Sequence, residues 1–165
     1  MKTENGKMES TNDIAVKVIE SKILTLRNQQ VMIDRDLAEL YGVETKVLNQ
    51  AVKRNINRFP ADFMFALEKT EKDELVTNCD RFNSLKHSST MPYAFTEQGV
   101  AMLSSVLKSD VAVDVNIHIM RAFVAMRHFL QTNAQVFAEL KDMGKKCFAF
   151  DVFDSAFVAD ILAKI

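Results

Sequence analysis

Residues 34–60 read DRDLAELYGVETKVLNQAVKRNINRFP, and this stretch decides the fold. It predicts two short helices joined by a tight turn. Asp34 is placed to cap the first helix with its carboxylate. Gly42 supplies the positive φ that a helix exit often needs. Thr45 can begin the second helix with a capping hydroxyl, and that helix must end two or three residues before Pro60, which cannot continue it.

The second helix separates its side chains by face. The residues expected to face inward are apolar and recur at helical spacing: Val47, Leu48, Ala51, Val52 and Ile56. The residues expected on the other side are polar: Lys46, Asn49, Gln50, Lys53 and Asn57, with Arg54 and Arg58 at the edge. Residues 44–58 carry four basic side chains and one acidic one, a local charge of +3. The pattern is that of a helix-turn-helix, whose second helix can enter a DNA major groove. An ordinary solvated amphipathic helix would also fit it.

The exposed side chains suit base and phosphate recognition. Asn and Gln can pair with adenine, whereas Arg and Lys can bind guanine or phosphate. The polar segment 78–91 is expected to be an exposed loop or two-stranded wing that could follow a phosphate backbone, or simply a disordered connector. The candidate DNA-binding residues are Thr45, Lys46, Asn49, Gln50, Lys53, Arg54, Asn57, Arg58, Arg81 and Lys86.

The composition limits the function classes. The chain has 165 residues, of which 48% are hydrophobic and 26% charged, so one domain with a core and an appendage is expected. The net charge of −1 means that any DNA contact must come from a local patch. Cys79 and Cys147 lack metal-ligand spacing and are expected to be free thiols of a cytoplasmic protein without a membrane segment. No enzyme motif, cofactor site or metal site is apparent, so neither catalysis nor a cofactor is expected.

The flanking segments predict an α+β fold. An N-terminal β-hairpin and short strands accompany the helix pair, and a mainly helical half with one long helix follows. The expected elements are a hairpin over 23–33, a buried strand over 63–67, a helix capped by Thr70 and Asp73, a strand over 92–95, a helix from Thr96 and a long helix from Asp110. The long helix should turn Val111, Val115, Ile117, Ile119, Met120, Phe123 and Val124 inward. The expected units are a disordered segment at 1–13, a domain at 14–127 and a helical extension at 128–165.

A second apolar stripe suggests self-association. Its residues alternate spacings of three and four, as in helices that pack on a partner helix. They are Phe123, Met126, Leu130, Asn133, Phe137 and Leu140. The stripe predicts a homodimer through the C-terminal helix, or else packing within the same domain. A last amphipathic helix from Asp154 could cover an exposed surface.

Three runs resemble a known family: VMIDRDLAELYGVETKVLNQAVKRNINRFPADFMFAL, PYAFTEQGVAMLSSVL and DVNIHIMRAFVAMR. They are similar to phage and bacterial DNA-binding domains of the KilA-N type, in the ORF6N branch, and the resemblance covers about residues 23–127. The resemblance implies a compact α+β domain that binds double-stranded DNA, found in phage antirepressors and mobile-element regulators. Two functions follow as hypotheses: a DNA-binding transcriptional regulator, or a module that binds a repressor protein without contacting DNA.

Overall fold

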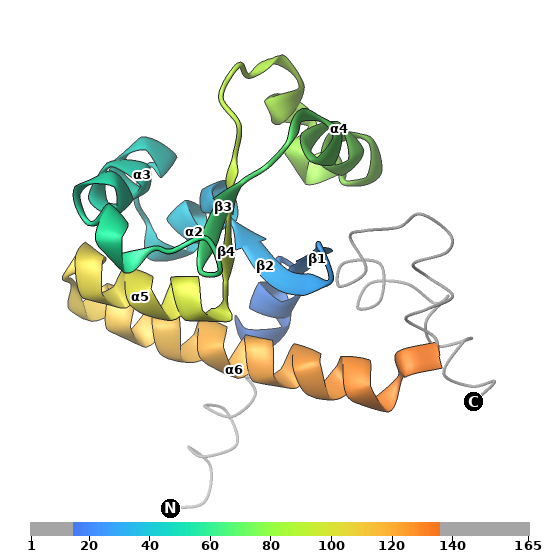
Figure 1. Cartoon of the computed structure of the whole chain (residues 1–165). Helices are drawn as coiled ribbons and strands as arrows, with labels where there is room; N and C mark the ends of the chain where they lie inside the picture. Colours follow the sequence, from blue (N-terminus) through green and yellow to red (C-terminus); the bar gives the residue numbers. More distant parts are fainter. Residues whose placement is uncertain (1–14, 136–165) are drawn as a thin grey trace, which may run out of the picture.

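The computed structural model describes residues 15–135, which form the α+β fold that the sequence predicts. A short helix over residues 15–20 leads into a small sheet surrounded by helices (Figure 1). The further elements are β1 (Leu24–Leu26), β2 (Gln29–Ile33), α2 (Asp34–Tyr41), α3 (Thr45–Arg54), the 3₁₀ helix η1 (Ile56–Arg58), β3 (Met64–Ala66), α4 (Lys69–Asn78), the 3₁₀ helix η2 (Asp80–His87), β4 (Tyr93–Thr96), α5 (Glu97–Leu107) and α6 (Asp110–Thr132). The predictions for residues 1–13 and for the tail after Gly144 lie outside the described residues.

The predicted N-terminal hairpin is confirmed, with a tighter turn than its polar run suggests. β1 and β2 are joined by Arg27 and Asn28, whose φ angles of 52° and 60° are both left-handed. Two consecutive left-handed residues match the twist of a β-hairpin. Gln29 already pairs with Leu26 inside the ladder. β2 ends at Ile33 and α2 begins at the next residue, so the sheet fixes where the helix pair starts.

The four strands are antiparallel, in the order β1-β2-β4-β3. β4 was expected from the sequence and lies in the middle of the sheet, where Phe95 pairs with both Met32 and Met64. β3 is an edge strand and is only half-buried, because it has a neighbour on one side alone; the expectation of a buried strand there is wrong. β4 thus pairs with β2, which precedes the helix pair in the sequence, and with β3, which follows it.

Both faces of the sheet are covered, and β2 shows this by alternation. Met32 belongs to the main core with α2, α3, α5 and α6, whereas Val31 and Ile33 belong to a second core beneath α4 and η2. Successive side chains of a strand point to opposite faces, so one strand can serve both cores. In Figure 1, α5 and α6 lie on one side of the sheet and α4 on the other.

The segment after β3 differs most from expectation. The capping box of α4 is formed by Glu68 and Glu71, each two residues before its predicted counterpart, so the helix begins at Lys69. Residues 80–87 are not a loop or wing but the helix η2, which packs on α4 and buries Phe82 completely. Cys79 is buried and disulfide-bonded, so the expectation of a free thiol is wrong for this residue.

The two C-terminal helices are capped by hydroxyl groups. Thr96 accepts a hydrogen bond from the Gly99 N–H, which confirms the predicted start of α5. For α6 the cap is Ser109, which accepts from the Ala112 N–H at 3.1 Å, rather than the predicted Asp110. α6 continues without interruption to Thr132, so the expected boundary between residues 127 and 128 falls inside a helix. No helix within residues 15–135 is long and apolar enough to cross a membrane.

The facing of α6 corrects two predictions. Ile119 and Phe123 point into the core as expected, but the predicted inner residues Val111, Ile117 and Val124 are exposed. Phe123 and Met126 are buried in the domain's own core, and Leu130 packs against that core. The Asn133 side chain donates to the Phe129 carbonyl of its own helix. These four therefore do not form a free dimerisation stripe, and Phe137 and Leu140 lie outside the described residues.

Candidate nucleic-acid interface

The turn between α2 and α3 has the geometry that the sequence predicts. Gly42 adopts φ 68°, and the N–H groups of Gly42 and Val43 donate to the carbonyls of Glu39 (3.2 Å) and Ala38 (3.0 Å). These bonds satisfy carbonyls that the end of a helix leaves unpaired. α2 and α3 pack against each other, and α3 also contacts α5. The two helices are thus joined by a tight turn, and α3 lies at one side of the molecule (Figure 1).

One side of α3 is anchored and the opposite side is open. Leu48 and Val52, at 0% and 3% exposure, join the main core. Four predicted polar residues on the other side are exposed, as expected: Lys46, Gln50, Lys53 and Arg54. Val47 is 47% exposed rather than buried, because it lies at the edge of the same open side, three residues before Gln50.

The end of α3 comes earlier than expected. The helix stops at Arg54, and the side-chain amide of Asn55 donates to the Ala51 carbonyl at 2.9 Å. The next three residues form η1, whose different phase leaves the predicted core residue Ile56 55% exposed. Asn57 is exposed in η1. Arg58 is exposed too, and its guanidinium donates to Ser105 Oγ at 3.1 Å. Asn57 and Arg58, two of the predicted contacts, therefore lie beyond α3 itself.

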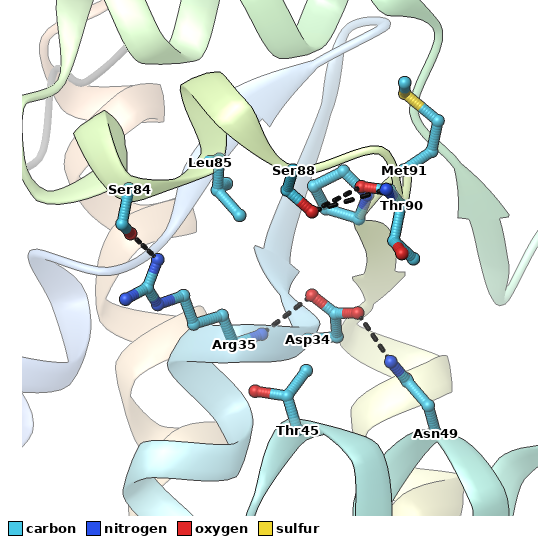
Figure 2. Close-up of a pocket in the computed structure, with 10 residues that line it drawn as sticks. Asp34, Arg35, Thr45, Asn49, Ser84, Leu85, Ser88, Thr90 and Met91 are labelled. Atoms are coloured by element: carbon cyan, nitrogen blue, oxygen red, sulfur yellow. Dashed lines mark hydrogen bonds between the residues drawn. The ribbon is translucent and has the colours of Figure 1, made fainter.

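Asn49 is held by the fold. Its amide nitrogen donates to Asp34 Oδ2 at 2.9 Å, and its amide oxygen is buried without a hydrogen-bond partner among the described residues (Figure 2). The other Asp34 oxygen accepts from the Arg35 N–H at 2.8 Å. The N-cap position of α2 is Ile33 and Asp34 is the first residue of the helix, so Asp34 is not the cap that the sequence predicts. Asp34 instead links the start of α2 to the middle of α3.

Asp34 and Asn49 both line a cleft of about 450 Å³. The cleft lies between the first turns of α2 and α3 and the segment from η2 to β4, and half-buried Thr45 lines it (Figure 2). The Arg35 guanidinium donates to Ser84 Oγ across it. Two predicted contact residues, Thr45 and Asn49, thus line this cleft and do not lie on the open side of α3.

Burial raises the pKa of the Asp34 carboxyl above its ordinary 3.8, and the Asn49 hydrogen bond opposes this only in part. A raised pKa in the folded state means that folding favours the protonated form. The resulting stability is full below pH 3.8 and is lost as the pH rises through the raised pKa. Asn cannot ionise. As the pH rises across this window, the unfolding free energy of Asp34→Asn should therefore increase relative to that of the natural protein.

Urea unfolding at a series of pH values measures this difference. Asp80→Asn removes a carboxylate at an exposed position and is the matched control, and the trend should be larger for Asp34→Asn than for this control. A difference between Asp34→Asn and the natural protein that stays constant with pH would contradict the assignment.

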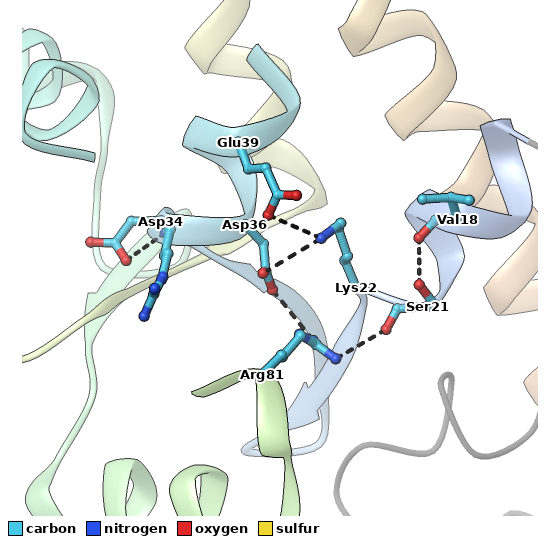
Figure 3. Close-up of polar contacts among 8 residues, drawn as sticks. Val18, Ser21, Lys22, Asp34, Asp36, Glu39 and Arg81 are labelled. Atoms are coloured by element: carbon cyan, nitrogen blue, oxygen red, sulfur yellow. Dashed lines mark hydrogen bonds and ion pairs between the residues drawn. The ribbon is translucent and has the colours of Figure 1, made fainter. Parts of the chain in front are cut away.

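Arg81 is part of an internal charge cluster rather than an open surface (Figure 3). Its guanidinium lies 3.3 Å from Asp36 Oδ2, donates to the Ser21 carbonyl, and lies over the Phe82 ring at 4.5 Å. Asp36 is 3% exposed and is also 3.9 Å from the Lys22 ammonium. Burial raises the pKa of Asp36, while the Arg81 and Lys22 charges lower it. Arg81 therefore joins η2 to α2, and its expected orientation toward a phosphate backbone is not found.

Arg81→Met is expected to lower the unfolding free energy by about 2 kcal/mol, because it leaves the buried Asp36 with a single, more distant cation. Urea unfolding tests this. Arg127→Met breaks a more exposed pair with Glu97 and should cost less than about 1 kcal/mol. The double variant with Asp36→Asn should recover part of the Arg81→Met loss. Equal losses from Arg81→Met and Arg127→Met would show that the internal cluster adds nothing.

Lys86 is exposed on η2 and is the remaining predicted contact. The open side of α3 thus has four of the ten predicted residues. Val47 lies beside them, although the spacing of apolar residues predicted that it faces inward. A helical projection of residues 45–54 could have found Val47, since it falls between Arg54 and the buried side.

Comparison with known proteins gives one match. The family model described as the ORF6N domain matches residues 21–106, a range that begins before β1, includes the helix pair and ends in the last turn of α5. No curated protein and no solved structure matches the chain.

Proposed function

Since the chain belongs to the ORF6N domain family, we propose that it is a DNA-binding regulator of the phage or mobile-element type, with α3 entering the major groove of double-stranded DNA. The observation that supports this most is the division of α3, whose apolar side is anchored by Leu48 and Val52. Its open side presents side chains that can bind bases or phosphates: Lys46, Gln50, Lys53 and Arg54.

The proposal assigns different tasks to these residues. Lys46, Lys53 and Arg54 supply positive charge for phosphates or guanine, and Gln50 has the paired donor and acceptor that fit adenine. Asn49 receives no base contact, because its amide is bound to Asp34 and its oxygen is buried. The low net charge of the chain makes this local patch the source of DNA affinity.

Gln50→Ala is expected to relax the base preference at one position of the target, by roughly 1–3 kcal/mol for the lost bidentate pair. Binding competition between the selected target and its single-base variants measures this preference. Gln131→Ala removes the same side chain from an exposed position of α6 and should leave the preference unchanged. An unaltered preference in the Gln50 variant would remove this residue from the interface.

Selection of bound fragments from random duplex DNA tests the function itself. The natural chain should enrich a common sequence, and binding to it should weaken as the salt concentration rises. Absence of enrichment at low salt would contradict the proposal.

A second candidate is an antirepressor-type module that binds a repressor protein. The net charge of −1 and the exposed apolar side chains of α6 favour it. Recovery of a bound repressor, together with no mobility shift of any genomic DNA fragment at low salt, would favour this candidate over the first.

A further inference from the structure

α6 exposes apolar side chains in a line. Of the seven large hydrophobic residues that are exposed within residues 15–135, four lie on this helix. Val113, Ile117 and Val124 are 50%, 45% and 53% exposed, and Met120 between them is half-buried. Their spacings of four, three and four place them along one line of the helix, which we call the outer stripe. Figure 1 shows α6 at the edge of the fold, with α5 and the sheet on one side of it.

The outer stripe is symmetric about its own midpoint. Val113 and Val124 are equally distant from the point between residues 118 and 119, and so are Ile117 and Met120. Two antiparallel copies of α6 related by a twofold axis at this point would place Val113 against Val124 and Ile117 against Met120. An interface around a twofold axis uses the same patch on both copies and therefore needs this self-complementarity.

The shape of the stripe fits the same arrangement. A shallow apolar hollow of about 550 Å³ lies at its C-terminal half and is lined by Met120, Arg121, Val124, Ala125 and His128. An antiparallel second copy would bring its own N-terminal half to this hollow, in the way that knobs enter holes between packed helices.

The charges beside the stripe select the antiparallel orientation. Asp110 and Asp114 lie next to its N-terminal half, and Arg121 and His128 lie next to its C-terminal half. Asp114 and Arg121 are exposed, and neither forms an ion pair within residues 15–135. Antiparallel packing places the acidic half of one copy beside the basic half of the other, whereas parallel packing would not bring these opposite charges together.

From this geometry we infer that the outer stripe is the contact surface between two copies of the chain, packed antiparallel through α6. This surface differs from the stripe beginning at Phe123 that the sequence suggested, because Phe123 and Met126 fill the domain's own core. The inference does not depend on DNA binding, since it uses no residue of α3.

Sedimentation of the full chain over a wide range of concentration tests the inference. The natural chain should convert from monomer to dimer as concentration rises. Ile117→Glu should raise the dissociation constant at least about tenfold, because each dimer loses two buried isoleucines. Val111→Glu is the matched control: Val111 is 61% exposed on the same helix but lies off the stripe, so its dissociation constant should not change. Circular dichroism verifies that both variants fold.

Charge reversal tests the orientation. Asp114→Arg and Arg121→Asp should each weaken the dimer a few-fold, because each places like charges together at two symmetric contacts. A mixture of the two variants should restore dimerisation, since each reversed charge then meets an opposite one. The inference is overturned by a chain that is monomeric throughout, which is also the result expected if its own residues 136–165 cover the stripe. It is equally overturned by equal effects of Ile117→Glu and Val111→Glu, or by a mixture that associates no better than its components.

Discussion

A variant with Lys46, Lys53 and Arg54 all replaced by alanine should bind the selected DNA about a hundredfold more weakly than the natural chain at low salt. The three cations are exposed on the side of α3 opposite its buried anchor, and removing them leaves that side uncharged. If all three contact phosphates, the slope of affinity against salt concentration should become shallower by about one for each lost contact. Fluorescence anisotropy with a labelled duplex over a salt series measures both quantities.

A matched variant separates local charge from total charge. Lys17, Lys69 and Arg127 are exposed on other parts of the fold, and replacing these three with alanine changes the net charge equally. This control should retain nearly all of the affinity, because exposed charges farther away than about 10 Å are largely screened. Equal losses in the two variants would mean that α3 has no special part in binding.

Gly99→Ala is expected to destabilise the domain by about 3 kcal/mol. A Cβ atom at this position would lie 2.1 Å from the Phe63 carbonyl oxygen, far inside contact distance. That oxygen accepts hydrogen bonds from the Thr96 N–H at 3.0 Å and from the Thr96 hydroxyl at 3.2 Å, so it cannot move away without breaking them. The start of α5 is therefore packed directly on the chain that leads into β3.

The sign of this effect is diagnostic. Replacing an exposed glycine inside a helix by alanine usually raises the unfolding free energy by about 0.5–1 kcal/mol. Urea unfolding of Gly99→Ala should instead show a large loss, while Gln98→Ala, at the exposed neighbouring position, should change stability little. A gain in the glycine variant would show that the close approach to Phe63 does not hold in solution.

Sequence patterns predicted the elements whose causes are local. The turn at Gly42 and the cap at Thr96 each depend on a few adjacent residues, and both were found where expected. The outward direction of Lys46 and Gln50 followed in the same way from the spacing of apolar residues in one short helix.

The errors have long-range or ambiguous causes. α6 has valine at 111, 113 and 115 in succession, so apolar residues occur on several sides and periodicity cannot select the buried one. Arg81 meets Asp36 across 45 residues of chain, and Asn49 meets Asp34 across 15. Such contacts are formed by the tertiary fold, and no local pattern in either segment predicts them. The same holds for η2, which is stabilised by packing on α4.

The central claim is that α3 is the surface that meets DNA, and nuclear magnetic resonance of the full chain tests it most directly. Titration with the selected duplex should shift the backbone amide signals of residues 45–58, with much smaller shifts in α6. Shifts confined to other elements, with those of residues 45–58 unchanged at saturating DNA, would contradict the account.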